Sequence, residues 1–117
     1  MEPKANIDFD MDECPVHYAL TLLGGKWKLL IVWVLAQQDC IRFNELQRNL
    51  DGISAIMLSK NLQELEADGI VDRKKYDVIP PKVEYSLSDL GKQIKPALET
   101  LGMWGIEAYQ HGNNKKQ

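Results

Sequence analysis

The chain has 117 residues and a formal net charge of −3, which is enough for one globular domain and argues weakly against nucleic-acid binding. No apolar run approaches the roughly 18 residues needed to span a bilayer, and the acidic start MEPKANIDFD does not resemble a secretory signal, so we expect neither a membrane segment nor export. Two cysteines far apart form no disulfide framework, which favours a reducing cytoplasm.

The acidic residues are concentrated at the start of the chain. Residues 1–14 contain five acids and one base, a balance of −4, so the remaining residues carry +1. We expect residues 1–13 to form an acidic flexible tail, residues 14–110 one domain and residues 111–117 a polar, disordered tail. Nucleic-acid binding stays open, because local charge matters more for phosphate contact than the total.

The domain is predicted to open with an apolar helix. Cys14 and Pro15 begin it, because a proline at the first helical position costs no hydrogen bond. Apolar residues cover much of its circumference. This pattern predicts burial on two sides, by the core of the domain and by a second subunit.

A second apolar helix is predicted after the glycine pair at residues 24–25. It is nearly all apolar and is expected to be the central core helix. Trp27 and Trp33 lie within this apolar run, which favours the core over a stacking platform. Lys26 and Lys28 at its start either meet phosphate or stay solvated.

A helix-turn-helix is predicted next. Residues 40–42 are long enough for an edge strand, and residues 43–50 for about two helical turns. Asp51 and Gly52 then turn the chain into another helix. Two short helices joined by a tight glycine-containing turn are typical of this motif.

The second helix of this pair has clear ends and two different faces. Ser54 is a natural N-cap, and Gly69 can adopt the left-handed conformation that ends a helix. Leu58, Leu62 and Leu65 recur at helical spacing and form the buried face. The opposite face has no acid, so it suits either the edges of base pairs in a major groove or plain solvent. That face carries Ile56, Ser59, Lys60, Gln63 and Ala67.

A basic hairpin follows this helix. Residues 70–76 and 82–87 are alternating, β-branched runs around a turn with two prolines, which predicts a hairpin with a stiff tip. Four bases and one acid lie between Arg73 and Lys82. A helix followed directly by a basic hairpin is typical of a winged helix-turn-helix, in which the helix reads a groove and the wing holds the backbone.

The chain is predicted to finish in one long helix. Ser88 caps it, its apolar stripe reaches Tyr109, and Pro96 should bend it. Met103 and Ile106 lie off the stripe and are candidates to face a partner. The fold class is therefore mainly α with a small β-hairpin, a winged helix-turn-helix that forms a homodimer through its first and last helices.

Six blocks of this sequence, in order, closely resemble the HxlR-type family of bacterial transcription regulators. The resemblance covers about residues 14–105 and implies a winged-helix homodimer that binds double-stranded operator DNA, more commonly as a repressor. It also implies that the cysteine before the proline, Cys14, senses oxidants or electrophiles, so a small reactive inducer is an expected partner. The blocks are Cys14-Pro15, Gly24-Gly25-Lys26-Trp27, Arg42-Phe43-Asn44-Glu45-Leu46, Gly52-Ile53-Ser54, Leu62-Gln63-Glu64-Leu65-Glu66-Ala67-Asp68-Gly69 and Pro80-Pro81-Lys82-Val83-Glu84-Tyr85.

The expected DNA-binding residues lie on the recognition helix and the wing. The chain has Ala55 and Ile56 where the family often has polar or basic residues. Ile56 either reads a thymine methyl group or packs on the preceding turn. The full set is Ser54, Ala55, Ile56, Ser59, Lys60, Gln63, Arg73, Lys75 and Lys82.

Two other functions compete with DNA binding. A winged-helix adaptor that binds only protein would lack salt-dependent DNA binding. A thiol enzyme would pair Cys14 with His17 on the same helical side, but no third catalytic group stands out, so we expect no enzyme. No metal site or cofactor is expected either, because two cysteines and two histidines match no zinc spacing.

The chemistry of the cysteines stays open. A helix N-terminus stabilises the thiolate of Cys14, but neighbouring acids oppose this, so Cys14 is either reactive or structural. Cys40 is expected to be a small buried hydrophobe. A disulfide between Cys14 and Cys40 of the other subunit is a further alternative.

Overall fold

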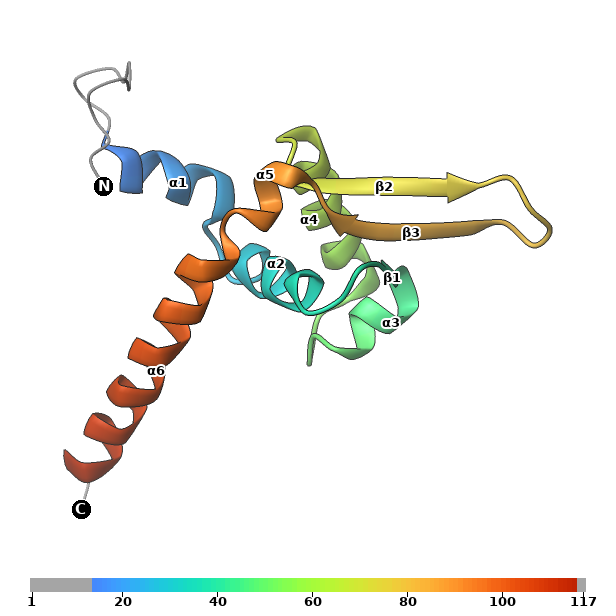
Figure 1. The fold of residues 1–117 in the computed structure, drawn as a ribbon. Helices are drawn as coiled ribbons and strands as arrows, with labels where there is room; N and C mark the ends of the chain where they lie inside the picture. Colours follow the sequence, from blue (N-terminus) through green and yellow to red (C-terminus); the bar gives the residue numbers. More distant parts are fainter. Residues whose placement is uncertain (1–13, 116–117) are drawn as a thin grey trace.

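The computed structural model describes residues 14–115, so the expected acidic tail lies outside the described residues. A central body carries a β-hairpin that projects to one side, while the first and last helices diverge on the other (Figure 1). The helices and strands are α1 (Pro15–Leu23), α2 (Lys28–Ala36), β1 (Ile41–Arg42), α3 (Phe43–Arg48), α4 (Ala55–Ala67), β2 (Val71–Tyr76), β3 (Lys82–Leu87), α5 (Asp89–Lys92) and α6 (Lys95–Lys115).

The three strands form one antiparallel sheet in the order β1-β3-β2. The hairpin pairs Val71 with Leu87 at its base and Tyr76 with Lys82 at its far end. Val71 and Leu87 are buried, whereas the strands beyond them leave the body. The predicted hairpin and short edge strand are confirmed, and we call the hairpin, residues 71–87, the wing.

The core is built around one face of α4. Leu58, Leu62 and Leu65 are at most 1% exposed, as their spacing predicts. Ser54 caps the helix by accepting a hydrogen bond from the N–H of Met57 at 3.0 Å. The buried residues of α2, α3 and the sheet complete the core around these leucines: Ile31, Val32, Leu35, Ile41, Leu46, Val71 and Leu87.

A tight joint connects α4, the wing and α5. Gly69 has a φ of 77°, and the next N–H, of Ile70, donates to the carbonyl of Leu65 at 2.9 Å, which closes α4 in a Schellman motif. The backbone N–H of Ser88 returns to the Ile70 carbonyl at 3.0 Å. A Cβ on Gly91 would lie 2.3 Å from the same carbonyl oxygen, so only glycine allows α5 to pack this closely.

The end of the chain differs from the prediction of one bent helix. The structure has two helices, α5 and α6, and Pro96 lies in the first turn of α6. The first four N–H groups of a helix lack intrahelical partners, so a proline there costs less than one in the middle. Helix α6 also continues through residues 111–115, past the start of the expected polar tail.

The expectation that Trp33 lies in the core is wrong. Its exposed fraction is 38%, whereas Trp27 packs against the core as expected. Helix α2 buries Ile31 and Val32 but turns Trp33 and Leu30 outward. Because α2 is apolar around nearly its whole circumference, the sequence pattern does not show which side of the helix packs against the core.

Within residues 14–115, no single helix is long and apolar enough to cross a bilayer. Only α1 and α2 together reach the required length and composition, and they meet at a bend of 85°.

Candidate nucleic-acid interface

The face of α4 that carries the predicted base-reading residues points away from the core. Ile56 is 84% exposed, and Lys60 and Gln63 are exposed as well. The Gln63 amide donates to the Ser59 hydroxyl at 3.3 Å, so these two polar side chains lie one turn apart on the same face. Ile56 therefore does not pack on the preceding turn, one of its two predicted placements. Ala55 is also exposed, at the first residue of the helix.

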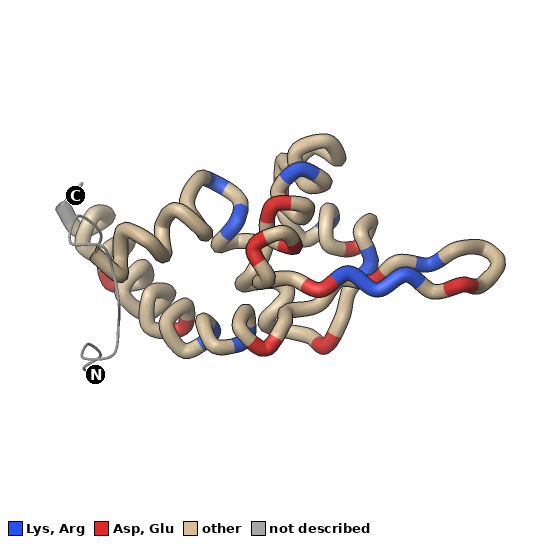
Figure 2. The backbone as a smooth tube through the Cα atoms, turned by 90° about the horizontal axis from the view of Figure 1, so that it is seen from above, with Lys and Arg blue, Asp and Glu red and all other residues tan. Residues whose placement is uncertain are grey.

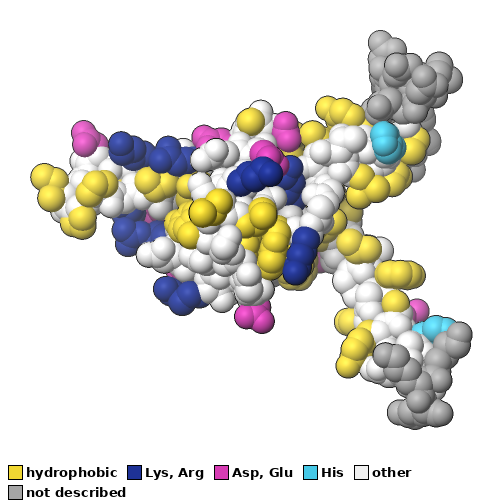
Figure 3. All heavy atoms as spheres, turned by 180° about the vertical axis from the view of Figure 1, so that it is seen from behind, with side chains coloured by type: hydrophobic (Ala, Val, Ile, Leu, Met, Phe, Trp, Pro, Cys, Tyr) yellow, Lys and Arg dark blue, Asp and Glu magenta, His cyan; other side chains and the backbone are white. Residues whose placement is uncertain are grey.

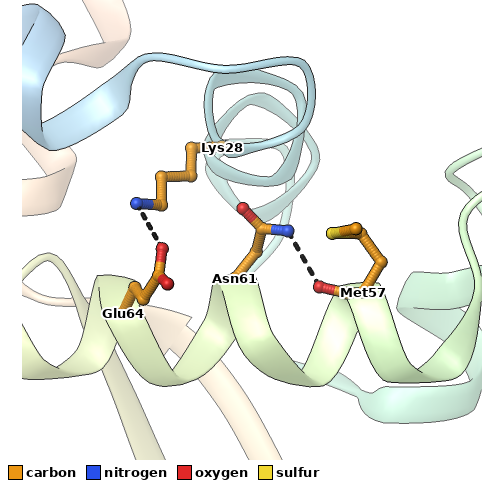
Figure 4. Close-up of polar contacts among 4 residues, drawn as sticks. All are labelled: Lys28, Met57, Asn61 and Glu64. Atoms are coloured by element: carbon orange, nitrogen blue, oxygen red, sulfur yellow. Dashed lines mark hydrogen bonds and ion pairs between the residues drawn. The ribbon is translucent and has the colours of Figure 1, made fainter.

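An ion pair connects another side of α4 to α2. The ammonium of Lys28 lies 2.7 Å from the carboxylate of Glu64, and the Lys28 side chain is only 14% exposed (Figure 4). Lys28 is thus neither solvated nor turned toward phosphate. The hydrogen bond and charge of Lys28 hold the pKa of Glu64 below its usual value. Asn61 lies beside this pair, and its amide donates to the Met57 carbonyl at 2.8 Å.

The bases of the wing are divided between its two faces. Figure 2 shows consecutive bases along β2. Because side chains alternate along a strand, Arg73 and Lys75 share the face of buried Val71, and Lys74 lies on the other. Arg73 lines a hollow with Ser59, Gln63 and the acid Glu66 of α4, so this face of the wing adjoins the exposed face of the helix.

Lys82 lies on the opposite face of the wing from Arg73 and Lys75. It is paired with Tyr76, and its ammonium lies 3.4 Å from Glu84 and 4.6 Å from the centre of the Tyr76 ring. The Tyr76 hydroxyl donates to Glu84 at 2.9 Å, which is the main reason that the pKa of this carboxyl is lowered. The structure therefore does not bring together the three wing bases that we grouped from the sequence.

Two arginines near the wing were missed. Arg42 and Arg48 are exposed at opposite ends of α3, and both line a groove between α3 and Pro81 and Val83 of the wing. Arg42 is part of one of the sequence blocks that carry the family resemblance, and only this resemblance could have marked it as a DNA-binding candidate. Nothing in the local sequence predicts that α3 lies against the wing.

The two cysteines occupy different environments. Cys14 is the exposed N-cap of α1, and its sulfur accepts a hydrogen bond from the N–H of His17 at 3.3 Å. Cys40 is also exposed, so the expectation of a buried hydrophobe is wrong; it directly precedes β1, an edge strand of the sheet. A hydrogen bond to Glu84 raises the pKa of the Cys40 thiol, which disfavours its reactive thiolate. Among the described residues no cluster of side chains could hold a metal ion.

The first and last helices carry large exposed apolar side chains. On α1 these include Val16 and Leu20, at 68% and 53% exposed, and on α6 Trp104 and Tyr109, at 67% and 72%. Yellow side chains recur along both helices in Figure 3. We call α1 and α6 the arms, and no other part of residues 14–115 covers their apolar surface.

Comparison with known proteins gives consistent matches over these elements. The model of the HxlR-like helix-turn-helix family matches residues 22–113. An uncharacterised HTH-type transcriptional regulator of Halalkalibacterium halodurans is 48% identical over 98 residues, which are 84% of this chain and 87% of that protein. The redox regulator HypR in its reduced form is 39% identical with a TM-score of 0.80, covering 86% of this chain and 99% of that one. The reduced form of the transcriptional regulator YodB from Bacillus subtilis is 34% identical with a TM-score of 0.69, covering 79% and 90%.

Proposed function

Because the chain belongs to the HxlR-like helix-turn-helix family, we propose that it is a homodimeric, sequence-specific repressor that binds operator DNA in the cytoplasm. Its sequence blocks predicted this family, and its relatives are transcription regulators and not enzymes. The observation that carries this proposal is the exposed face of α4 with Ile56, Lys60 and Gln63, which lies beside the face of the wing that bears Arg73 and Lys75. A helix that can read a DNA groove thus lies beside a basic surface of the wing that can bind phosphates.

Helix α4 reads the major groove. The Lys60 and Gln63 side chains contact base edges, and Ile56 packs on a thymine methyl group, since it is 84% exposed and no polar partner suits it. Ser54, Ala55 and Ser59 lie at the start of this face and approach the backbone or bases. A good base contact contributes about 1–3 kcal/mol of discrimination.

The wing and α3 hold phosphates. Arg73 and Lys75 lie on the face that adjoins α4, so they meet the backbone beside the groove that α4 occupies. Arg42 and Arg48 extend this basic surface. Lys82 attracts phosphate less strongly than an unpaired lysine would, because Glu84 neutralises part of its charge.

The arms form the homodimer. Two copies that bury α1 and α6 against each other would cover the exposed apolar side chains of both helices. Their two α4 helices then lie about one DNA turn apart, roughly 34–36 Å, and the operator is a near-palindrome.

Cys14 senses oxidants or electrophiles. It is exposed at the N-terminus of an arm, and matched structures include the redox regulator HypR in oxidised form and YodB treated with diamide. An adduct or an intersubunit disulfide at an interface shifts the packing of the arms, and therefore the spacing of the two α4 helices. A change of a few kcal/mol in DNA affinity switches occupancy more than tenfold.

The first experiment measures binding to the DNA upstream of the gene over a range of salt concentrations. Arg73→Ala should weaken binding to all sequences and lower the salt slope by about one, whereas Lys60→Ala and Gln63→Ala should change the preferred sequence. Salt-independent or absent DNA binding would favour a protein-binding adaptor. If both α4 variants keep the wild-type preference, the base-reading face is wrong.

The second experiment repeats the titration with diamide or a quinone. Wild-type protein should change its operator affinity, while Cys14→Ser should keep its basal binding and lose the response. Cys40→Ser should keep the response if Cys14 reacts without Cys40, since a raised pKa disfavours the Cys40 thiolate, and should lose it if Cys14 pairs with Cys40 of the other subunit. Equal responses of wild type and Cys14→Ser would exclude Cys14 as the sensor.

A further inference from the structure

The side of α4 that meets α2 lies between two other faces of the same helix. We call the exposed face with Ile56, Lys60 and Gln63 the reading face. At about 100° per residue, Glu64 falls between this face and the buried face with Leu65. The Lys28 ammonium reaches Glu64 from the first residue of α2, at 2.7 Å from its carboxylate (Figure 4). A contact at this position restrains the rotation of α4 about its own axis.

Lys28 is fixed to a rigid part of the body. The turns of α2 that follow it bury Ile31, Val32 and Leu35, and its own side chain is only 14% exposed. A distance of 2.7 Å is typical of a charge-assisted hydrogen bond, which has a preferred geometry. The Glu64 side chain is 45% exposed, so solvent screens the pair and its contribution to stability is small. Its main effect is therefore on the orientation of α4.

The other restraints on α4 define this orientation less closely. The buried leucines hold the helix against the core, but apolar attraction has no preferred direction. The side-chain amides of Asn61 and Gln63 donate to groups one turn earlier in the same helix. On the side toward the wing, a hollow lies between Ser59 of α4 and Arg73 and Tyr85 of the strands. This hollow leaves room for the helix to rotate.

We propose, on the basis of the proposed function, that Lys28 is a positioning residue for base recognition, which acts through Glu64 to set the rotation of α4 in the major groove. A rotation of about 20° moves an atom at the roughly 6 Å outer radius of a helix by about 2 Å. Hydrogen-bond lengths vary by only about 0.5 Å, so Lys60 and Gln63 would lose their base edges. The phosphate contacts of the wing would remain. Lys28 thus affects sequence preference although it contacts no DNA.

The test removes the pair without changing the net charge, in the double variant Lys28→Met/Glu64→Gln. Its operator affinity should fall about tenfold, the value of a good base contact. Its affinity for mixed-sequence DNA and its salt slope should match wild type, because no phosphate contact is lost. The reversed pair Lys28→Glu/Glu64→Lys should regain operator preference. Lys26→Met is the matched control, since Lys26 is exposed, lies over the Trp27 ring at 4.8 Å and should not affect the preference.

A double-mutant cycle separates positioning from stability. All variants are compared at a temperature at which thermal unfolding shows them to be folded. Lys60→Ala should weaken operator binding in the wild-type background but have little further effect in the double variant, because the base contact is already lost there. A variant that was only less stable would instead lose the full effect of Lys60→Ala in both backgrounds.

Three results would overturn the inference and leave the proposed function in place. The double variant could prefer the operator as strongly as wild type, the folded reversed pair could restore no preference, or Lys60→Ala could act additively with the double variant. The first would show that the pair does not orient α4, and the others would assign the loss to packing. Wild-type protein that binds no DNA sequence preferentially would remove both the inference and the proposed function.

Discussion

The body and the arms use the same kinds of apolar residue in opposite ways. In the body, the leucines of α4 are at most 1% exposed and meet α2 and the sheet within one chain. In the arms, Val16 and Trp104 remain 68% and 67% exposed. The body therefore has a complete core, whereas the arms have an apolar surface that stays exposed within residues 14–115. The difference favours the proposal that folding depends on the body and assembly on the arms.

The strongest test of the body is Leu62→Ala. Leu62 is 1% exposed, so truncation leaves a cavity and should cost about 2–5 kcal/mol in the free energy of unfolding. Ile56→Ala on the same helix should change that energy by less than about 0.5 kcal/mol, because Ile56 is 84% exposed. Chemical denaturation measures both. A similar cost for the two variants would contradict the assigned faces of α4.

The corresponding test of the arms is Trp104→Ala. If the arms form the dimer, each dimer loses two large side chains, and its dissociation free energy should fall by about 2 kcal/mol or more. Sedimentation at micromolar concentration should show the wild-type dimer shifting toward monomer in the variant. Ile56→Ala, exposed but on the body, should stay dimeric. A wild-type monomer at that concentration would show that the arms serve another purpose.

The close packing of α5 on the loop after α4 depends on Gly91. A Cβ at this position would lie 2.3 Å from the Ile70 carbonyl oxygen, so Gly91→Ala must move α5 and should cost about 1–3 kcal/mol. Gly112→Ala is the matched control, since nothing lies within 4 Å of a Cβ there. Thermal unfolding should separate them. Equal stability of both variants would mean that α5 is free to shift on the body.

The smallest effect is expected from Glu64→Gln. Lys28 holds the pKa of Glu64 in the folded state below its unfolded-state value, which is about 4.5. The ion pair therefore stabilises the folded protein at pH values above about 4.5. The contribution should disappear as pH falls through the lower, folded-state pKa. The difference in unfolding free energy between wild type and Glu64→Gln should therefore shrink in acid. Glu66→Gln, at an exposed position of α4, is the control, and a gap that stays constant with pH would show that the pair is not the cause.

The sequence by itself determined the elements of the body. Ser54 and Gly69 mark the cap and the left-handed end of α4, and the structure has both. The leucine spacing identified the buried face, and the alternating runs around the prolines identified the wing. These signals act within a few residues of one another, which is why local sequence was sufficient.

Only the tertiary structure decided how those elements use their side chains. Strand register separates Lys82 from Arg73 and pairs it with Tyr76, and the packing of α2 on α4 turns Lys28 inward. Packing also places Arg42 beside the wing and leaves Trp33 at the surface. Lys28 and Glu64, and Arg42 and the wing, are distant in sequence. Composition and periodicity describe which residues a helix or strand presents, but the neighbour that a side chain meets depends on how the whole chain packs.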